Sequence, residues 1–414
     1  MNPVAPTERE PILDTLRGFA ILGILLVNIE IMRGPDWLVL TRGGTVAAGH
    51  LIDRIAQFAI GWLAAGKFIS SLAILFGVGA ALIVQRAVAR GAPARPLLAR
   101  RYVWLMVFGI AHMLIYPGDV LFVYGVAGFM LLPVIALPLS SMLRLSIVLM
   151  TVFVAVALLL SVSLAGALPD AGEVPVTSFD ETIDRLLAET VAAYASGSAA
   201  EIAAVHVSHA LLLQEGQFYM LPWIFALFLF GFAAGQAGIA RDVRGWAPLL
   251  RRGAILGLSL GLPLNLGLGY GGPLSGYGGY SDPLWITLWI ASAQLAGAPI
   301  LAVGYLCALA FYFLRHGVIR PLAAVGRMAL TAYILESALA LGFFGGLGLY
   351  GLLSTSSALL IVAAIWATLL VACPLWLRRF QLGPLEWLWR SLTYGRMQSL
   401  TGPSESAARR RSIS

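Results

Sequence analysis

Long apolar stretches separated by short polar loops dominate the chain. Each stretch is close to the roughly 20 residues that one crossing of a bilayer requires. The stretches fall near residues 13–32, 67–86, 98–116, 119–140, 143–167, 217–240, 250–270, 284–314, 322–350 and 353–376. The pattern predicts an all-α fold, a polytopic transmembrane bundle of about ten helices.

Two segments at the margins of this pattern need separate interpretation. Residues 46–66 are only half apolar and contain His50, Asp53 and Arg54, which favours an interfacial helix over an eleventh span. At the start of the chain, Glu8 to Glu10 lead directly into a full-length apolar run, unlike the basic start of a cleaved signal peptide. We expect the first span to be retained.

The loop charges predict how the helices are threaded. Arginines gather in the loops near residues 86–101, 241–252 and 315–320 and in the tail, and such loops lie on the cytoplasmic side. Ten helices with both termini cytoplasmic place all of these loops on one side. The acidic segment 168–216 and the glycine-rich loop Gly269–Ser281 then fall on the other. The expected location is a bacterial inner membrane.

Four regions follow from this threading. Residues 1–167 form an N-terminal half of five helices with an Asp-x-x-Arg-Gly motif, and 168–216 an external, periplasmic segment. Residues 217–376 form a C-terminal half of five helices, and 377–414 a cytoplasmic tail.

Composition excludes several classes of protein. Apolar residues make up 59% of the chain and charged residues 11%, against roughly a quarter charged in soluble domains. The net charge of +7 comes from scattered arginines, which argues against nucleic-acid binding. Cys307 and Cys373 lie within apolar runs, and the pair His206 and His209 lacks a third ligand at suitable spacing. We expect no metal site.

Polar residues at membrane depth need a partner or a function, because a charge there costs about 2.5–3.5 kcal/mol on insertion scales. Asp14, Arg17 and Asn28 share one face of the first helix. Asp14 and Arg17 are spaced for an ion pair that fixes the helix end. Asn28 lies about 20 Å further along, beyond their reach, and is a candidate for lining a cavity.

A tight turn between the third and fourth helices carries His112 and Asp119. A hairpin there would bring the imidazole and the carboxylate together, so that Asp119 orients the ring and His112 acts as a general base. In the alternative interpretation, Asp119 only caps its helix and His112 bonds to a backbone carbonyl.

Glu336 lies near the middle of the ninth apolar stretch and shares a helix face with Tyr333. A buried carboxylate is protonated or paired, and we consider Lys67 and His112 as its candidate partners. The alternative is a neutral, hydrogen-bonded glutamate with a structural role.

These motifs together resemble those of the YeiB family. The matching stretches are Leu13-Asp14-Thr15-Leu16-Arg17-Gly18 with Asn28, Gly66-Lys67-Phe68 leading to Leu75-Phe76-Gly77-Val78-Gly79, Gly109 to Tyr124, and Gly326 to Tyr333. The last of these, with Gly383-Pro384-Leu385-Glu386-Trp387-Leu388-Trp389-Arg390, resembles the family's C-terminal domain of unknown function 418.

The resemblance implies a distant relation to heparan-α-glucosaminide N-acetyltransferase. Enzymes of that group move an acetyl group from acetyl-CoA across a membrane to an external sugar. In those relatives the catalytic histidine closely follows the asparagine that corresponds to Asn28. This chain has no histidine before His50. Either His50 or His112 takes that role, or this branch performs other chemistry. Glu336 also stands where the family pattern leads us to expect an amide.

Three functions therefore remain open. The first is a membrane acyltransferase with acyl-CoA or acetyl-CoA as co-substrate and a small-molecule, glycan or lipid acceptor on the external face. Its expected residues are His112, Asp119 and His50 for catalysis, Arg100 and Arg101 for the CoA phosphates, and Asn28, Lys67, Tyr124, Tyr333 and Glu336 for substrate binding. The second is a transporter that uses the buried ionisable residues. The third is a non-catalytic membrane component. The lipid bilayer is the expected surroundings, and assembly as a homodimer is left open.

Overall fold

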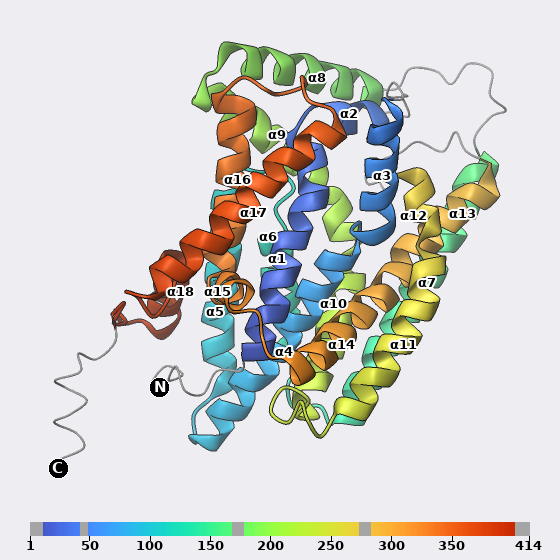
Figure 1. Cartoon of the computed structure of the whole chain (residues 1–414). Coiled ribbons are helices and arrows are strands. Elements are labelled where there is room, and N and C mark those ends of the chain that lie inside the picture. Colours follow the sequence, from blue (N-terminus) through green and yellow to red (C-terminus); the bar gives the residue numbers. More distant parts are fainter. Residues whose placement is uncertain (1–10, 42–48, 168–177, 273–282, 402–414) are drawn as a thin grey trace.

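The computed structural model describes residues 11–41, 49–167, 178–272 and 283–401, and in these ranges the chain forms helices and connecting loops without strands. The long helices run side by side as a bundle (Figure 1). A helical bundle is the architecture that the apolar pattern predicts, because helices satisfy their own backbone polar groups in lipid.

The helices of the first half are α1 (Pro11–Met32), α2 (Asp36–Thr41), α3 (Leu51–Leu63), α4 (Lys67–Ala89), α5 (Ala94–His112), α6 (Leu121–Leu131) and α7 (Leu139–Ala167). Two further helices, α8 (Ser178–Ser196) and α9 (Ala199–Tyr219), lead to the second half. That half comprises α10 (Leu221–Gln236), α11 (Ala247–Leu264), α12 (Leu266–Gly271), α13 (Leu284–Ser292), η3 (Ala293–Gly297), α14 (Ala298–His316), α15 (Arg320–Arg327), α16 (Ala329–Leu341), η4 (Gly342–Gly346), α17 (Thr355–Leu377) and α18 (Pro384–Tyr394).

Fewer of these helices are long and apolar enough to cross a membrane than the ten stretches suggested. Among the described residues six qualify, or seven if the bent pair α9 and α10 counts as one span. Several expected spans fall short: α6 has 11 residues, α10 has 16, and α5 begins with a cluster of arginines. The expected interfacial helix is also not separate, because α3 and α4 together form one candidate span, Leu51–Ala89.

Small residues allow the central helices to approach closely. A Cβ added to Gly77 of α4 would lie 2.2 Å from the Phe228 carbonyl oxygen of α10. A Cβ on Gly326 of α15 would lie 1.7 Å from the Asp14 carbonyl oxygen of α1. No side chain larger than hydrogen fits either contact. These contacts hold α4 against α10 and α1 against α15.

The expected ninth span is broken near its start. It forms α15 and α16, which are separated by Met328 with φ −110° and ψ 32°, values that leave the helical region. The first amides of α16 therefore lie inside the protein, where their N–H groups need acceptors. Non-helical backbone at membrane depth is tolerated only where other parts of the protein surround it or where it lines a cavity.

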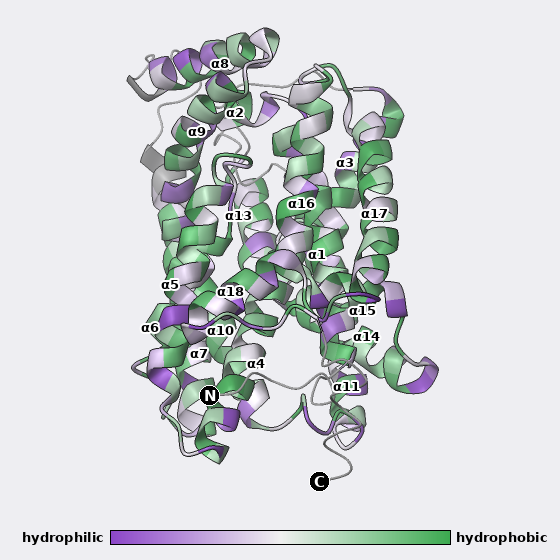
Figure 2. Cartoon of the chain, turned by 90° about the vertical axis from the view of Figure 1, so that its left-hand side faces the viewer, coloured by the Kyte–Doolittle hydropathy of each residue, from purple (hydrophilic) through white to green (hydrophobic). Residues whose placement is uncertain are grey.

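The two ends of the bundle differ in chemistry. The loops that connect α4 to α5 and α10 to α11 lie at one end, which we call the arginine-rich end, and α8 lies across the opposite end (Figure 1). Hydrophilic residues are concentrated near these two ends and hydrophobic ones between them (Figure 2). The predicted cytoplasmic termini and most of the loop Gly269–Ser281 fall outside the described residues.

Candidate functional site

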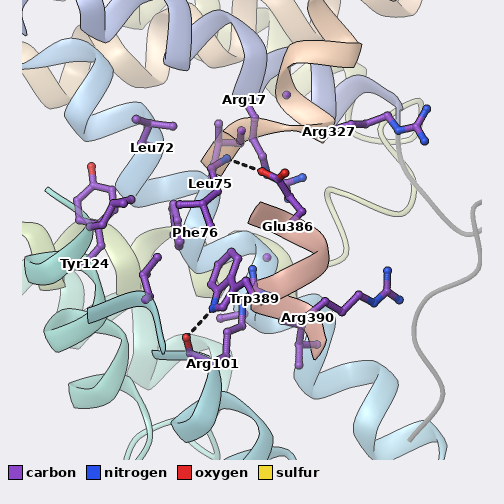
Figure 3. A pocket seen from close by; sticks show the side chains of 18 of the residues that line it. Arg17, Leu72, Leu75, Phe76, Arg101, Tyr124, Arg327, Glu386, Trp389 and Arg390 are labelled. Carbon is purple, nitrogen blue, oxygen red and sulfur yellow. Dashed lines mark hydrogen bonds between the residues drawn. The ribbon is translucent and has the colours of Figure 1, made fainter. Parts of the chain in front are cut away.

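A cavity of about 310 Å³ opens among α1, α4, α5, α6, α15, α16 and α18. Its lining extends along α4 from Leu72 to Arg86, a separation of 14 positions that spans about 21 Å at 1.5 Å per residue. Five arginines line it, namely Arg17, Arg86, Arg101, Arg327 and Arg390. The remaining lining is mostly apolar, so the cavity resembles an apolar tunnel with a basic mouth (Figure 3).

Arg101 and Trp389 meet at this mouth. The Arg101 guanidinium carbon lies 3.6 Å above the centroid of the Trp389 ring, and the Trp389 indole N–H donates to the Arg101 carbonyl oxygen at 2.9 Å. The stacking holds the guanidinium plane by a cation–π contact (Figure 3). Arg100, the other residue expected to bind phosphates, is exposed and does not line the cavity. Of the predicted pair, only Arg101 is in a position to contact a ligand there.

A carboxylate, Glu386 of α18, also lines the mouth. Its Oε1 accepts hydrogen bonds from the backbone N–H groups of Leu330 and Thr331, and its Oε2 accepts one from the Thr331 hydroxyl. Burial raises the pKa of the Glu386 carboxyl above its ordinary value, since the loss of water outweighs these hydrogen bonds.

Asp14 and Arg17 form the predicted ion pair at the same mouth. Arg17 donates to Asp14 Oδ1 at 2.9 Å, with 30% of the Arg17 side chain and 11% of the Asp14 side chain exposed. Both residues line the cavity, so the pair has a role in its shape and charge.

We expect single Asp14→Ala or Arg17→Ala changes to lower the folded yield, because each leaves one unpaired charge near the helix end. The double change should recover part of the loss, since no unpaired partner remains. Size-exclusion chromatography of the detergent-solubilised protein measures this. A double mutant no better than the worse single one would show that the pair contributes no coupling energy.

The inner end of the cavity is lined by Val120, Tyr124 and Tyr333. Tyr124 donates its hydroxyl to the Ile69 carbonyl oxygen at 2.5 Å, which fixes the ring. The Tyr333 hydroxyl is buried and has no hydrogen-bond partner among the described residues. Two of the residues predicted to bind substrate thus lie together at the end of the cavity.

His112 and Asp119 form the predicted pair next to this inner end. The His112 Nδ1 atom lies 2.8 Å from Asp119 Oδ1, and both side chains are fully buried. The His112 ring also contacts the Tyr333 ring, with 4.9 Å between centroids. A carboxylate only accepts, so the shared proton belongs on Nδ1, and in the neutral ring Nε2 carries the lone pair. His112 Nε2 has no partner among the described residues.

The turn that joins α5 to α6 creates this pair. Asp119 Oδ2 accepts from the Phe122 N–H at 2.9 Å, so Asp119 caps the start of α6 while its other oxygen holds the imidazole. A Cβ on Gly109 would lie 2.5 Å from the Phe122 nitrogen and 2.7 Å from Asp119 Oδ2. Asp119 therefore caps its helix with one oxygen, as the alternative interpretation expected, but its other oxygen holds His112, which does not bond to a backbone carbonyl of the described residues.

A second, much smaller cavity of about 20 Å³ lies on the other side of His112, toward α8. Tyr116, whose ring centroid is 6.0 Å from that of His112, lines it, as does Ser337 of α16. This volume is on the scale of one or two water molecules. His112 itself lines neither cavity, but its ring contacts Tyr333, which lines the large one, and Tyr116, which lines the small one.

Glu336 has neither of its expected partners. Both of its carboxyl oxygens are buried without a hydrogen-bond partner among the described residues. Lys67 instead donates to the Gly61 carbonyl oxygen at 2.9 Å, and His112 is bonded to Asp119. The pairing failed because Lys67 sits in the junction between α3 and α4, where an unsatisfied helix-end carbonyl is close by.

The other candidate residues lie apart from His112. His50 is exposed at the start of α3, where it is close enough to Asp53 of that helix to interact with its charge. Asn28 is buried in α1 but does not line the large cavity. His50 is therefore not placed to act at the inner end of the cavity.

The histidine pair of α9 is buried between α8 and α9. His206 bonds to the Tyr194 hydroxyl at 2.9 Å and to the Leu114 carbonyl oxygen at 3.0 Å, and His209 bonds to Thr190 at 2.8 Å. These bonds use both ring nitrogens of His206. The pair joins α8 and α9 to the turn after α5, so it stabilises the end of the bundle that covers His112.

Comparison with known proteins finds relatives of this chain. Residues 234–396, which include α16 and α18, match the family described as "Protein of unknown function (DUF418)". The chain is 29% identical to the uncharacterized protein YxaH of Bacillus subtilis (strain 168), over 95% of this chain and 96% of that protein. It is 28% identical to the uncharacterized protein YeiB of Escherichia coli (strain K12), over 93% and 96%. The chain is similar to YeiB-family proteins over nearly its whole length, and its residues 234–396 match DUF418.

The family resemblance drawn from the motifs is thus confirmed, and no solved structure matches the chain. The printed names of these YeiB-family relatives carry no activity, so acyl transfer remains a prediction.

The motif reasoning missed the cavity contacts of α18. It recognised Gly383 to Arg390 only as a family motif, although Glu386, Trp389 and Arg390 of that motif all line the cavity. A short amphipathic helix after the last span, with Trp and Arg on one side, was the available signal.

Proposed function

We propose that this protein is a transmembrane acyltransferase, which takes an acyl group from a cytoplasmic acyl-CoA and delivers it to an acceptor at the opposite end of the bundle. The observation that carries the proposal is the order of groups along one path. A basic mouth leads into an apolar tunnel, and the tunnel ends at Tyr333 beside a buried histidine with a free Nε2. This order of environments suits acyl transfer from a phosphorylated thioester, whose phosphates bind arginine and whose reaction needs a general base.

The residues at the inner end supply general-base chemistry. His112 Nε2 removes the proton from the acceptor's hydroxyl or amine as the acceptor attacks the thioester carbonyl. The carbon–sulfur bond then breaks, and His112 returns the proton to the departing thiolate. Asp119 fixes the ring and stabilises its positive charge between these two transfers. The unpartnered Tyr333 hydroxyl is a donor for the carbonyl oxygen, where negative charge develops.

The arginines at the mouth hold the donor's phosphates. Guanidinium groups bind phosphate with two parallel hydrogen bonds, and stacking against an indole leaves their N–H edges available. Arg101 stacks on Trp389 in this way and has Arg17 and Arg390 close enough to affect its charge. The apolar lining beyond the mouth excludes water from the thioester.

We expect Arg101→Ala to weaken binding of acyl-CoA by roughly ten- to a hundredfold, as loss of a charge-assisted phosphate contact costs about 1.5–3 kcal/mol. Arg100→Ala is the matched control, since it removes an exposed arginine one residue away. Equilibrium binding of radiolabelled acetyl-CoA to the purified protein compares the two. Equal losses of binding in both variants would mean that the overall positive charge of this region matters, and not a specific contact of Arg101 at the mouth of the cavity.

A second function, proton-coupled transport, has one specific observation in its favour. Glu336 places two unpartnered carboxyl oxygens inside the bundle, and intramembrane ionisable residues commonly form proton pathways. The acyltransferase proposal assigns Glu336 no step.

One experiment separates the two. Purified protein in lipid vesicles is given radiolabelled acetyl-CoA on the side of the arginine-rich end, and label is sought on protein, acceptor and free acid. Labelled transfer or hydrolysis that depends on His112 supports the acyltransferase. Its absence, with Glu336-dependent movement of protons across the vesicle membrane, supports the transporter.

A further inference from the structure

Helix α16 begins inside the protein without a cap of its own. Its N-cap residue is Met328, which has no side-chain acceptor. The next turn contains the N–H groups of Leu330 and Thr331, which have no acceptor within α16 itself. The Glu386 carboxylate of α18 is the acceptor for both N–H groups, with Oε1 at 2.6 Å from the Leu330 nitrogen and 3.0 Å from the Thr331 nitrogen. A residue 55 positions away from Thr331 thus caps α16.

The start of α18 is shaped around this contact. Glu386 Oε2 accepts from the Thr331 hydroxyl at 2.6 Å, and that hydroxyl accepts from the Leu385 N–H at 3.1 Å. A Cβ on Gly383 would lie 2.1 Å from Glu386 Oε2 and 2.8 Å from the Thr331 oxygen. Only glycine leaves room for the contact, and Pro384 then begins the helix.

The contact joins the two ends of the large cavity. On one side α18 carries Trp389, which stacks on Arg101 at the mouth. On the other side α16 carries Tyr333, two residues after Thr331, against the His112 ring. Loss of the cap would fray the first turn of α16, and this turn holds the backbone that places Tyr333.

We propose that Glu386 is a positioning residue, which caps α16 from α18 and so holds Tyr333 against His112. The proposal deepens the proposed acyl transfer and rests on it for its kinetic consequence. Its structural consequence does not depend on that function, because His112 is shielded by Tyr333 whatever reaction the site performs.

Two pairs of variants test the cap without removing a charge. Gly383→Ala forces Glu386 Oε2 away from Thr331, and Gly216→Ala is the matched control at an exposed glycine with no atom within 4 Å of an added Cβ. Thr331→Val removes the hydroxyl and Thr331→Ser restores it. Glu386→Ala, which removes both accepting oxygens, is the variant of choice if Gly383→Ala does not fold, and the same rise in His112 modification is expected.

The readout is the rate at which diethyl pyrocarbonate modifies His112 in the detergent-solubilised full chain, measured by peptide mass spectrometry. A cap of ordinary strength changes the population of a frayed helix start about tenfold, so we expect a rise of that order in Gly383→Ala and Thr331→Val. Gly216→Ala and Thr331→Ser should match the wild type. Folded Gly383→Ala and Thr331→Val proteins with unchanged His112 modification would overturn the proposal, as would an equal rise in Gly216→Ala.

Kinetics supply the second arm if the wild type transfers acyl groups. The cap variants should lower kcat with little change in KM for acyl-CoA, because the arginines of the mouth stay in place. A rise in KM alone would contradict the positioning role. A wild type without transfer activity would defeat the proposed function and leave the modification experiment as an independent test of the cap.

Discussion

His112→Ala should abolish acyl transfer while leaving acyl-CoA binding intact. The imidazole is the candidate base next to the inner end of the cavity, whereas the arginines proposed to hold the phosphates line the opposite part of it. Removal of a general base costs roughly 10²–10⁴-fold in rate. Transfer of label from acetyl-CoA and equilibrium binding of the same compound measure the two effects separately.

Asp119→Asn tests the partner of the base. An amide can still accept from His112 Nδ1, but it cannot stabilise the imidazolium, so the loss should be smaller than in His112→Ala. The amide has only one accepting oxygen, so it cannot keep both the contact with His112 and the cap on the Phe122 N–H, and the folded yield of this variant is measured alongside its activity. Loss of acyl-CoA binding in His112→Ala would indicate a structural histidine. Wild-type transfer in both variants would remove histidine-based chemistry from this site.

The sequence predicted the helical bundle and most helix positions, because long apolar runs have few other solutions in lipid. It did not predict where helices break or bend. Met328 separates α15 from α16 within one apolar stretch, and α9 and α10 meet at 60°. Hydropathy measures how residues partition between water and lipid. It does not show where backbone N–H groups donate hydrogen bonds to side chains far along the chain, such as Glu386.

Local spacing decided which parts of the site could be predicted. His112 and Asp119 are seven residues apart across a tight turn, so their pairing depends on short-range geometry alone. Glu336 and Lys67 are far apart in sequence, and their pairing depended on helix rotations that the sequence does not specify. The cavity required α5, α16 and α18 to meet, which is a property of the folded chain.

Arg33→Ala should be among the most destabilising substitutions in the protein. Arg33 donates to Glu30 Oε2 at 2.9 Å and to Asp36 Oδ2 at 2.7 Å, and also to the Leu353 carbonyl oxygen. Glu30 is fully buried, so removal of the guanidinium leaves a carboxylate without its main partner. Breaking such a buried pair costs about 3–5 kcal/mol. Urea unfolding of the detergent-solubilised protein, followed by tryptophan fluorescence, measures the loss.

The source of this loss can be isolated with a second substitution. If the cost arises from the stranded carboxylate, Glu30→Gln added to Arg33→Ala should recover a large part of it, because a buried amide is cheaper than a buried charge. Arg33→Ala alone should also loosen α17, since Thr355 at its start bonds to Glu30 Oε2 at 3.2 Å. A double variant as unstable as Arg33→Ala would assign the loss to the contacts with Asp36 and Leu353, which tie α1 to α2 and to the loop before α17.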